Sequence, residues 1–216
     1  MEDINKYLRE LRNDFSGEPL DENQAAREPF LQFDLWFKEA IKSGVNEPNA
    51  MTLSTIGENG RPSSRIVLLR EYDQRGFAFF TNYQSKKAKE LFQNPFACLN
   101  FFWPELERQV RIEGKVSMHS KEASDNYFNS RPRSSRIGAW SSPQSSELAD
   151  RAALENLVTT FDKKYPTEHV PRPEFWGGFL LQADYFEFWQ GRPSRLHDRI
   201  YYRHEQTDWK VGRLAP

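Results

Sequence analysis

The first part of the chain carries apolar residues at intervals of three and four, the spacing of an amphipathic helix. One apolar stripe contains Ile4, Tyr7, Leu8 and Leu11, and a second contains Phe30, Phe33, Phe37 and Ile41. The second stripe stops near Gly44, as expected at a helix end. Polar residues 16–28 separate the stripes, so we expect residues 1–28 to form a helix and a mobile arm, ahead of a single domain over residues 29–216.

From residue 51 onward the pattern changes to short strands separated by turns. Strands are predicted at 51–56, 64–70, 77–81, 96–103, 107–117, 179–189 and 200–214, the last interrupted by a turn at 206–208. Helices are predicted at 85–93, 121–129 and 146–165. These elements predict a mainly β fold with flanking helices, of the α+β class. An antiparallel, Greek-key-like barrel is the expected core, because closure removes exposed strand edges.

Composition narrows the range of functions. The 216 residues include 30 basic and 31 acidic side chains, so no overall field would attract nucleic acid or an anionic membrane. Cys98 is the sole cysteine, which rules out an internal disulfide and a multi-cysteine site, and we expect no metal. No apolar run approaches the roughly 20 residues of a membrane span, so we expect a cytoplasmic protein without membrane association. Any anion site must come from a local cluster.

The densest group of chemically versatile side chains lies in one short segment near the end of the sequence, and it contains Trp189, Arg195, His197 and Arg199. In an extended chain the last three would point to one face, because alternate residues of a strand share a face. Such a face could bind a ligand. The alternative is a barrel lining in which the arginines form salt bridges with Asp198.

Residues 80–87 are suited to a phosphate group. Thr81 is followed by Ser85, Lys86 and Lys87 at the start of a predicted helix, which combines hydroxyl, ammonium and backbone N–H donors. The alternative is a pair of solvated lysines. The chain has no glycine-rich dinucleotide loop and no P-loop, which argues against a Rossmann enzyme.

A further set of polar side chains is spaced by four residues, namely Tyr127, Arg131 and Ser135. A phenol, a guanidinium and a hydroxyl supply directional donors to one phosphate. The alternative is a helix end before Pro132 with a solvated Arg131.

Two further arginines, Arg65 and Arg70, bound the predicted strand at 64–70 and would point to opposite faces of it. This segment alone is also compatible with an ordinary surface strand, because arginine is mostly exposed in proteins.

Together these motifs resemble those of the pyridoxine (pyridoxamine) 5'-phosphate oxidase family over residues 8–216. The resemblance extends to the Glu-Arg-Gln-Val run at 107–110, to Gln144 and Ser145, and to the closing run at 213–216. It implies an FMN-binding split β-barrel. It also implies a homodimer with FMN at the interface, because in the family the Gln-Ser pair reaches the cofactor from the neighbouring subunit.

The resemblance also implies a role for each matching residue. Arg195 and His197 would act in catalysis. The substrate contacts would be Arg12, Arg70, Tyr127, Arg131, Ser135, Arg195 and His197. The FMN contacts would be Arg65, Ile66, Val67, Leu68, Leu69, Arg70, Phe80, Thr81, Lys86, Lys87, Gln109, Gln144, Ser145, Trp189 and Arg199.

The implied reaction oxidises pyridoxine 5'-phosphate and pyridoxamine 5'-phosphate to pyridoxal 5'-phosphate by hydride transfer to FMN, after which O2 reoxidises the flavin and gives H2O2. Two alternatives remain, namely another split-barrel flavoenzyme such as a flavin reductase relative, and a non-catalytic protein that binds flavin or pyridoxal phosphate. The sequence departs from the family pattern at Arg70, where lysine is more usual, and at Phe80 and Phe15, where tyrosine is frequent.

Overall fold

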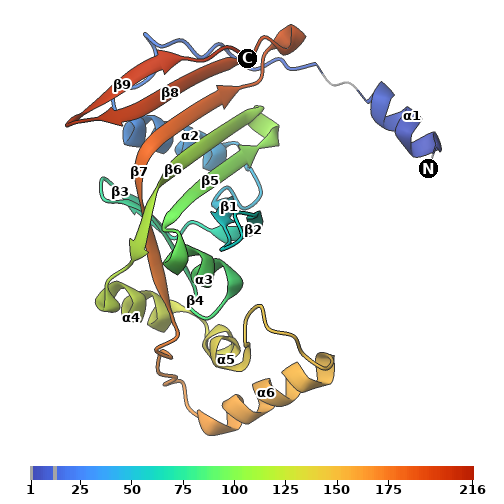
Figure 1. Ribbon diagram of the computed structural model, residues 1–216, viewed down its shortest axis with the longest axis vertical. Helices are drawn as coiled ribbons and strands as arrows, with labels where there is room; N and C mark the ends of the chain where they lie inside the picture. Colours follow the sequence, from blue (N-terminus) through green and yellow to red (C-terminus); the bar gives the residue numbers. More distant parts are fainter. Residues whose placement is uncertain (1, 12–13) are drawn as a thin grey trace. The chain divides into compact units, whose positions relative to one another are not determined.

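The computed structural model describes residues 2–11 and 14–216. The helices are α1 (Glu2–Glu10), α2 (Pro29–Lys42), α3 (Lys86–Gln93), α4 (Lys121–Ser130), α5 (Arg133–Ser141) and α6 (Arg151–Lys164). The strands are β1 (Ala50–Ile56), β2 (Pro62–Leu68), β3 (Glu71–Asp73), β4 (Gly76–Asn82), β5 (Phe96–Trp103), β6 (Arg108–Met118), β7 (Trp176–Gln190), β8 (Asp198–Glu205) and β9 (Asp208–Arg213). The predicted antiparallel β architecture with flanking helices is confirmed (Figure 1).

The strand order is β2-β1-β5-β6-β7-β4-β3, and β8 pairs with both β7 and β9. The chain forms two compact units. The first contains Met1–Pro48, Asn100–Ile112 and Tyr185–Pro216, and the second contains Asn49–Leu99 and Glu113–Asp184. Strands β5, β6 and β7 therefore each contribute residues to both units.

Aromatic side chains from α2, β5 and β7 form the core of the first unit. Phe33 packs against Phe101 with ring centroids 5.2 Å apart, and Trp36 packs edge-on against Phe188 at 5.3 Å. Burial of each such side chain contributes roughly 1.5–3 kcal/mol, so this cluster fixes α2 on the strands. The helix ends where Gly44 adopts φ +72°, a conformation that glycine takes readily because it has no Cβ.

The β7–β8 pair positions the candidate residues of the first unit (Figure 1). Its antiparallel register sets Trp189 opposite Arg199 and Phe188 opposite Ile200. Because successive strand residues alternate between faces, Phe188 and Ile200 lie in the core while Trp189 and Arg199 lie half-buried on the other face.

In the second unit, β4 pairs with the first part of β7, and Phe79 and Phe179 face each other with ring centroids 5.7 Å apart. Helices α4 and α5 are joined to this layer by a smaller apolar cluster of Phe128, Ala139 and Trp176. This cluster positions the helix ends that carry the predicted phosphate ligands.

Some element boundaries differ from the prediction. Helix α5 is not predicted by the sequence. Its serine-rich start and Gly138 are typical of a loop, and its apolar face, which buries Ile137 and Ala139, is too short to give a helical pattern. The helix predicted at 146–165 begins only at Arg151, where the Asp150 carboxylate accepts from the backbone N–H of Ala153 at 2.7 Å and caps the helix.

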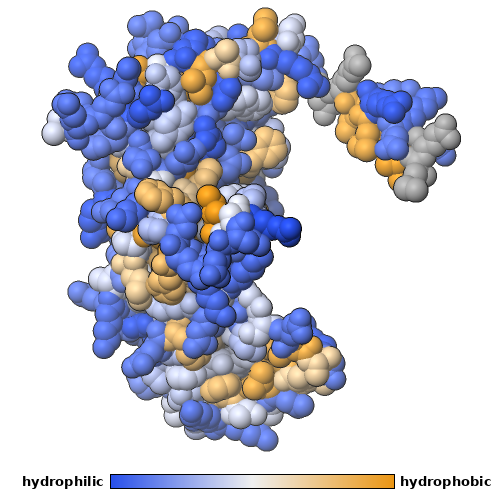
Figure 2. Space-filling model, in the orientation of Figure 1, coloured by the Kyte–Doolittle hydropathy of each residue, from blue (hydrophilic) through white to orange (hydrophobic). Residues whose placement is uncertain are grey.

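The apolar stripe of α1 is exposed, with Ile4 64% and Leu8 58% accessible, and appears orange in Figure 2. None of the helices in the described ranges is long and apolar enough to cross a membrane. Residues 2–11 and 14–216 also contain no group of three or more acidic, histidine or cysteine side chains that could hold a metal ion.

Candidate active site

The second unit contains a cavity of about 780 Å³, within the size range of small-molecule sites. Strand β2, the end of β4, the start of α3 and the junction of α4 with α5 contribute to its wall. The predicted site residues that line it are Arg65, Ile66, Val67, Leu68, Arg70, Phe80, Thr81, Lys87, Tyr127, Arg131, Ser135 and Gln144. The structure therefore brings most of the predicted FMN and substrate-phosphate contacts of this unit together.

Lys87 is a buried cation in the cavity wall. Its ammonium donates to Gln144 Oε1 at 2.9 Å, Thr81 Oγ1 at 3.1 Å and Ser85 Oγ at 3.4 Å. Within the described part of the chain, no carboxylate forms an ion pair with it. Burial lowers the pKa of Lys87 to about 8, and the charge of Arg65 adds to the effect. A buried ammonium with only neutral partners is unfavourable, so this position favours an anionic ligand.

Arg65, by contrast, has a counter-ion within the protein. Its Nη2 donates to Glu90 Oε2 at 3.2 Å and to Ser63 Oγ at 2.5 Å, while Nη1 donates to Thr55 Oγ1 at 2.5 Å and Leu53 O at 3.2 Å. Burial alone would raise the pKa of Glu90, but hydrogen bonds from Thr55 and Ser63 and the charge of Arg65 lower it overall. Glu90 therefore stays ionised and fixes Arg65.

Arg70 lies beyond the end of β2. The strand predicted at 64–70 ends at Leu68, so the alternation expected to point Arg65 and Arg70 to opposite faces does not extend to Arg70, and both arginines line the cavity. The backbone N–H of Arg70 instead donates to Ala78 O at 2.9 Å. Leu69 is buried in the core rather than in the cavity wall.

Three stacked aromatic rings form one side of the cavity. Phe80 lies 4.1 Å from Tyr127 and 5.8 Å from Trp176, measured between ring centroids. The guanidinium of Arg70 lies 5.6 Å from the Tyr127 centroid, and that of Arg131 lies 4.7 Å from the Trp176 centroid. Because each cation–π contact contributes about 0.5–2 kcal/mol, the rings help to hold both arginines in place.

Arg131 is incompletely satisfied. Its Nη1 is buried and has no hydrogen-bond partner among the residues that the structure describes. Burial lowers the pKa of Arg131, and the positive charge of Arg70 adds to this. An orphaned buried donor costs about 1–3 kcal/mol, so a ligand anion that accepts from Arg131 would remove this cost. Ser135, on α5, lies in the same wall.

Lys86 and Ser145 are not brought into this cavity. They line a second cavity of about 720 Å³ in the same unit. Lys86 is exposed, with Nζ 3.9 Å from Glu90 Oε1. Ser145 has φ +70°, a left-handed conformation that costs a residue with a Cβ roughly 1–2 kcal/mol.

In the first unit, Trp189 and His197 lie together, with ring centroids 4.7 Å apart, and Phe15 contacts both rings edge-on at 5.6 and 5.2 Å. His197 Nδ1 accepts from the backbone N–H of Arg192 at 3.1 Å, so the neutral ring carries its proton on Nε2. Burial lowers the pKa of His197, and the charge of Arg195 adds to this. The imidazole is therefore neutral near pH 7.

Arg195 is exposed and belongs to a tight turn. The prediction that Arg195, His197 and Arg199 share one face of an extended chain is wrong, because β8 begins only at Asp198. Ser194 and Arg195 have φ values of +56° and +60°. Each of these left-handed conformations costs roughly 1–2 kcal/mol, and backbone strain of this kind concentrates at functional sites.

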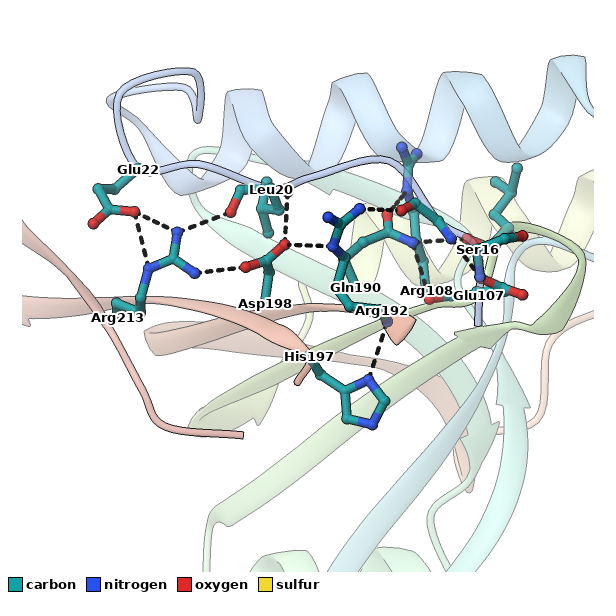
Figure 3. A network of polar contacts seen from close by, with 12 residues as sticks. Ser16, Leu20, Glu22, Glu107, Arg108, Gln190, Arg192, His197, Asp198 and Arg213 are labelled. Atoms are coloured by element: carbon teal, nitrogen blue, oxygen red, sulfur yellow. Dashed lines mark hydrogen bonds and ion pairs between the residues drawn. The ribbon is translucent and has the colours of Figure 1, made fainter. Parts of the chain in front are cut away.

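Residues 14–22 are held against the rest of the first unit by polar contacts (Figure 3). The backbone N–H groups of Ser16 and Gly17 both donate to Glu107 Oε2 at 2.8 Å. The guanidinium of Arg192 donates in turn to the Gly17 carbonyl. These bonds hold the segment that places Phe15 against His197.

The far end of the same segment is held by Arg213, whose side chain pairs with Glu22 at 2.5 Å and with Asp198 at 2.6 Å (Figure 3). Asp198 also accepts from the backbone N–H of Leu20 at 3.1 Å. The closing residues of the sequence therefore help to anchor the N-terminal segment.

Two of the remaining predicted contacts lie on strands β6 and β8. Gln109 is half-buried on β6, and Arg199 lies on β8, where its Nε donates to Glu187 Oε1 at 2.8 Å. Arg12 lies outside the described residues, so its substrate contact stays a prediction.

Sequence reasoning does not single out three residues that shape these sites, namely Glu90, Trp176 and Glu187. For Glu187 a signal exists, because an acid between two phenylalanines in a buried strand requires a partner. For Glu90 and Trp176 the sequence holds no such signal, since their partners lie on distant elements.

The cavity of the second unit fits FMN and a phosphate-bearing substrate in its chemistry. Among the described residues, no carboxylate forms an ion pair with Lys87 and no group accepts from Arg131 Nη1, and a flat aromatic wall lies beside them. This antiparallel sheet and this site fit the class of flavin-binding split-barrel proteins.

Comparison with known proteins gives the family. Residues 37–164 match the family described as pyridoxamine 5'-phosphate oxidase, and residues 176–216 match the pyridoxine 5'-phosphate oxidase C-terminal dimerisation region. The chain belongs to the pyridoxamine 5'-phosphate oxidase family, and its cofactor is FMN.

Relatives in this family cover nearly the whole chain. The pyridoxine/pyridoxamine 5'-phosphate oxidase of Burkholderia ambifaria is 53% identical over 212 residues, which are 97% of this chain and 99% of that protein. The enzyme of the same name from Actinobacillus succinogenes is 52% identical over 209 residues, again 97% and 99% of the two chains. The chain is thus an oxidase of the type that defines this family.

Two solved structures share the fold. PhzG from Burkholderia lata, in complex with tetrahydrophenazine-1-carboxylic acid, matches with a TM-score of 0.87 and 30% identity, over 93% of this chain and 100% of that one. A pyridoxamine 5'-phosphate oxidase-related, FMN binding protein from Nostoc punctiforme matches with a TM-score of 0.70 and 20% identity, over 88% and 98%. These likenesses confirm the predicted split barrel.

Proposed function

We propose that the protein oxidises pyridoxine 5'-phosphate and pyridoxamine 5'-phosphate to pyridoxal 5'-phosphate, with O2 as the final acceptor and H2O2 as a product. The alcohol gives the aldehyde directly, whereas the amine gives an imine that water hydrolyses to aldehyde and ammonia. Relatives 53% and 52% identical carry this substrate pair in their names. The structural observation that carries the proposal is the buried Nη1 of Arg131, for which residues 2–11 and 14–216 provide no acceptor.

The substrate phosphate would bind between Arg70 and Arg131, with Tyr127 and Ser135 as further donors. Both guanidiniums are already held against aromatic rings, so little side-chain freedom would be lost on binding. Charge-assisted hydrogen bonds to phosphate are among the stronger polar contacts, and they would select phosphorylated substrates over free vitamers.

Bound FMN supplies the hydride acceptor, and the protein's task is placement. Arg195 would fix the substrate's ring, and His197 would orient the reacting substituent through the proton on Nε2. Neither side chain is assigned as a strong general base, because hydride transfer does not require one at this site.

The active form would be a homodimer with FMN at the interface. The match of residues 176–216 to a dimerisation region supports this arrangement. We expect light scattering to give twice the 25.5 kDa chain mass and flavin absorbance to give one FMN per chain. A monomer that retained stoichiometric FMN would contradict the shared site.

Anaerobic mixing separates this function from its alternatives. The holoprotein should lose its oxidised-flavin absorbance when pyridoxine 5'-phosphate or pyridoxamine 5'-phosphate is added, and it should regain that absorbance on admission of air. Bleaching by a reduced phenazine carboxylic acid but by neither vitamer would assign it instead to a function like that of PhzG. A stable yellow colour with every compound would indicate a binding protein.

A further inference from the structure

Glu187 is a carboxylate buried in the middle of a strand. Its exposed fraction is 2%, and its neighbours Phe186 and Phe188 lie on the opposite, core-facing side of β7. Two arginines approach it in the first unit, with Arg111 Nη2 2.6 Å from Oε2 and Arg199 Nε 2.8 Å from Oε1. The acid therefore joins guanidinium groups from β6 and β8.

The protonation state of Glu187 follows from these partners. Burial alone would raise its pKa, but the hydrogen bonds from Arg199 and Arg111 outweigh burial and hold the pKa below its ordinary value. The side chain is therefore an anion at neutral pH. For Arg199 the same contact raises the pKa, since the hydrogen bond that it donates to Glu187 exceeds the effect of burial.

Arg199 is oriented by two fixed contacts. Its Nε donates to Glu187, and its Nη1 donates to Ala215 O at 2.8 Å. Its backbone carbonyl accepts from the N–H of Leu214 at 2.9 Å, which fixes the same stretch of chain. The Nη2 group has no acceptor among residues 2–11 and 14–216, and Arg199 stands opposite Trp189 in the strand register. Its side chain is thus held with the Nη2 group left to donate to a ligand.

We propose that Glu187 is a positioning residue for the cofactor, which holds Arg199 in the one orientation that presents Nη2 to FMN. This rests on the FMN contact that the family resemblance implies for Arg199, and it is independent of which substrate is oxidised. Without the carboxylate, the long arginine side chain would sample several rotamers and lose that freedom on binding. A carboxylate that served only to stabilise the strands would leave FMN affinity unchanged.

The test is a double-mutant cycle read out as FMN affinity. Flavin is removed from wild type, Glu187→Gln, Arg199→Gln and the double variant, and the dissociation constant is measured by quenching of FMN fluorescence. We expect about a tenfold loss in Glu187→Gln and at least as much in Arg199→Gln, as for removal of one charge-assisted bond. Because both act through one contact, the double variant should match Arg199→Gln within about twofold.

Glu39→Gln is the control, since Glu39 pairs with Arg108 in the same unit and does not contact Arg199. Its FMN affinity should stay within about twofold of wild type. If Glu187→Gln does not fold, Glu187→Asp keeps the charge, shortens the reach and should show a smaller loss of affinity. Circular dichroism of each apoprotein checks folding.

An unchanged affinity in folded Glu187→Gln, or losses that multiply in the double variant, would overturn the inference. Unchanged affinity in Arg199→Gln would overturn it as well, by removing Arg199 from the cofactor site. A protein that follows the expected cycle but oxidises neither vitamer phosphate would overturn the proposed function and leave the role of Glu187 intact.

Discussion

Two neighbouring cations in the second unit are stabilised in opposite ways. Arg65 is paired with the buried carboxylate of Glu90, whereas Lys87 donates only to hydroxyl and amide oxygens in the described part of the chain. An ion without a counter-ion is unfavourable in a desolvated position. Lys87 is therefore the side chain of this cavity that would gain most from a bound phosphate.

This difference predicts a pH dependence of FMN binding. The pKa of Lys87 is lowered to about 8 in the protein without ligand, so above that pH the amine must take up a proton when a phosphate binds. The logarithm of the FMN dissociation constant should therefore rise by up to about one per pH unit above pH 8. Fluorescence titrations at several pH values above 8 measure this dissociation constant. Lys87→Met should bind FMN more weakly and lose the dependence, and an equal slope in both proteins would contradict the assignment.

The same shift sets the sign of the stability change. The unfolded chain retains the ordinary Lys pKa of 10.5, so between pH 8 and that value it binds more protons than the folded apoprotein. The contribution of Lys87 thus makes the apoprotein more stable as the pH rises through this window. Urea unfolding at several pH values gives the free energy of unfolding of the wild-type apoprotein and of Lys87→Met. This free energy should rise more steeply with pH in the wild type. If the free energy of unfolding rose more steeply with pH in Lys87→Met, Lys87 would not be the group that causes the pH dependence.

Arg70 gives a third prediction at the residue scale. Loss of a charge-assisted contact to phosphate costs about 1.5–3 kcal/mol, which corresponds to a tenfold to hundredfold change. Arg70→Ala should raise the KM for pyridoxamine 5'-phosphate by that factor with little effect on flavin retention, and Arg70→Lys should recover much of the loss. Steady-state kinetics would decide, and an unchanged KM in Arg70→Ala would mean that this arginine does not hold substrate.

At the scale of elements, hydrophobic alternation predicts most strands because half-buried strands must alternate. The pattern fails where the chain leaves a strand, as at Leu68 and before Asp198, since an apolar or basic residue past the end looks like a continuation. Helix α5 is missed for another reason. Its short apolar face is recognisable only once Trp176, from a distant strand, lies against it.

The aromatic wall is the element-scale feature that sequence could not predict, because Phe80, Tyr127 and Trp176 come from three different elements. Trp176→Ala should destabilise the protein by about 3–5 kcal/mol, as is typical for buried aromatic residues. It should also raise the KM, because Arg131 loses the ring beneath it. Trp176→Phe keeps a ring and should restore most of both. Urea unfolding measures the loss of stability and steady-state kinetics measure the KM. A normal KM in folded Trp176→Ala would show that the aromatic wall does not contribute to substrate binding.

For the whole molecule, the candidate contacts are divided between the two units. Lys87, Arg70 and Arg131 belong to the second, and Trp189, His197 and Arg199 belong to the first. The sequence motifs indicate which residues to consider, through their resemblance to a family. They do not indicate which arginine each buried acid holds, because such pairs depend on contacts between strands and helices far apart in sequence.

The central claim is that the protein oxidises pyridoxine 5'-phosphate and pyridoxamine 5'-phosphate with O2 as the final electron acceptor. The most direct measurement mixes the FMN-loaded protein with pyridoxamine 5'-phosphate in air and quantifies pyridoxal 5'-phosphate and H2O2 together, with unphosphorylated pyridoxamine as the control. The account predicts one peroxide for each pyridoxal phosphate formed and far slower turnover of the control. Absence of pyridoxal phosphate, its formation without peroxide, or equal turnover of both compounds would contradict it.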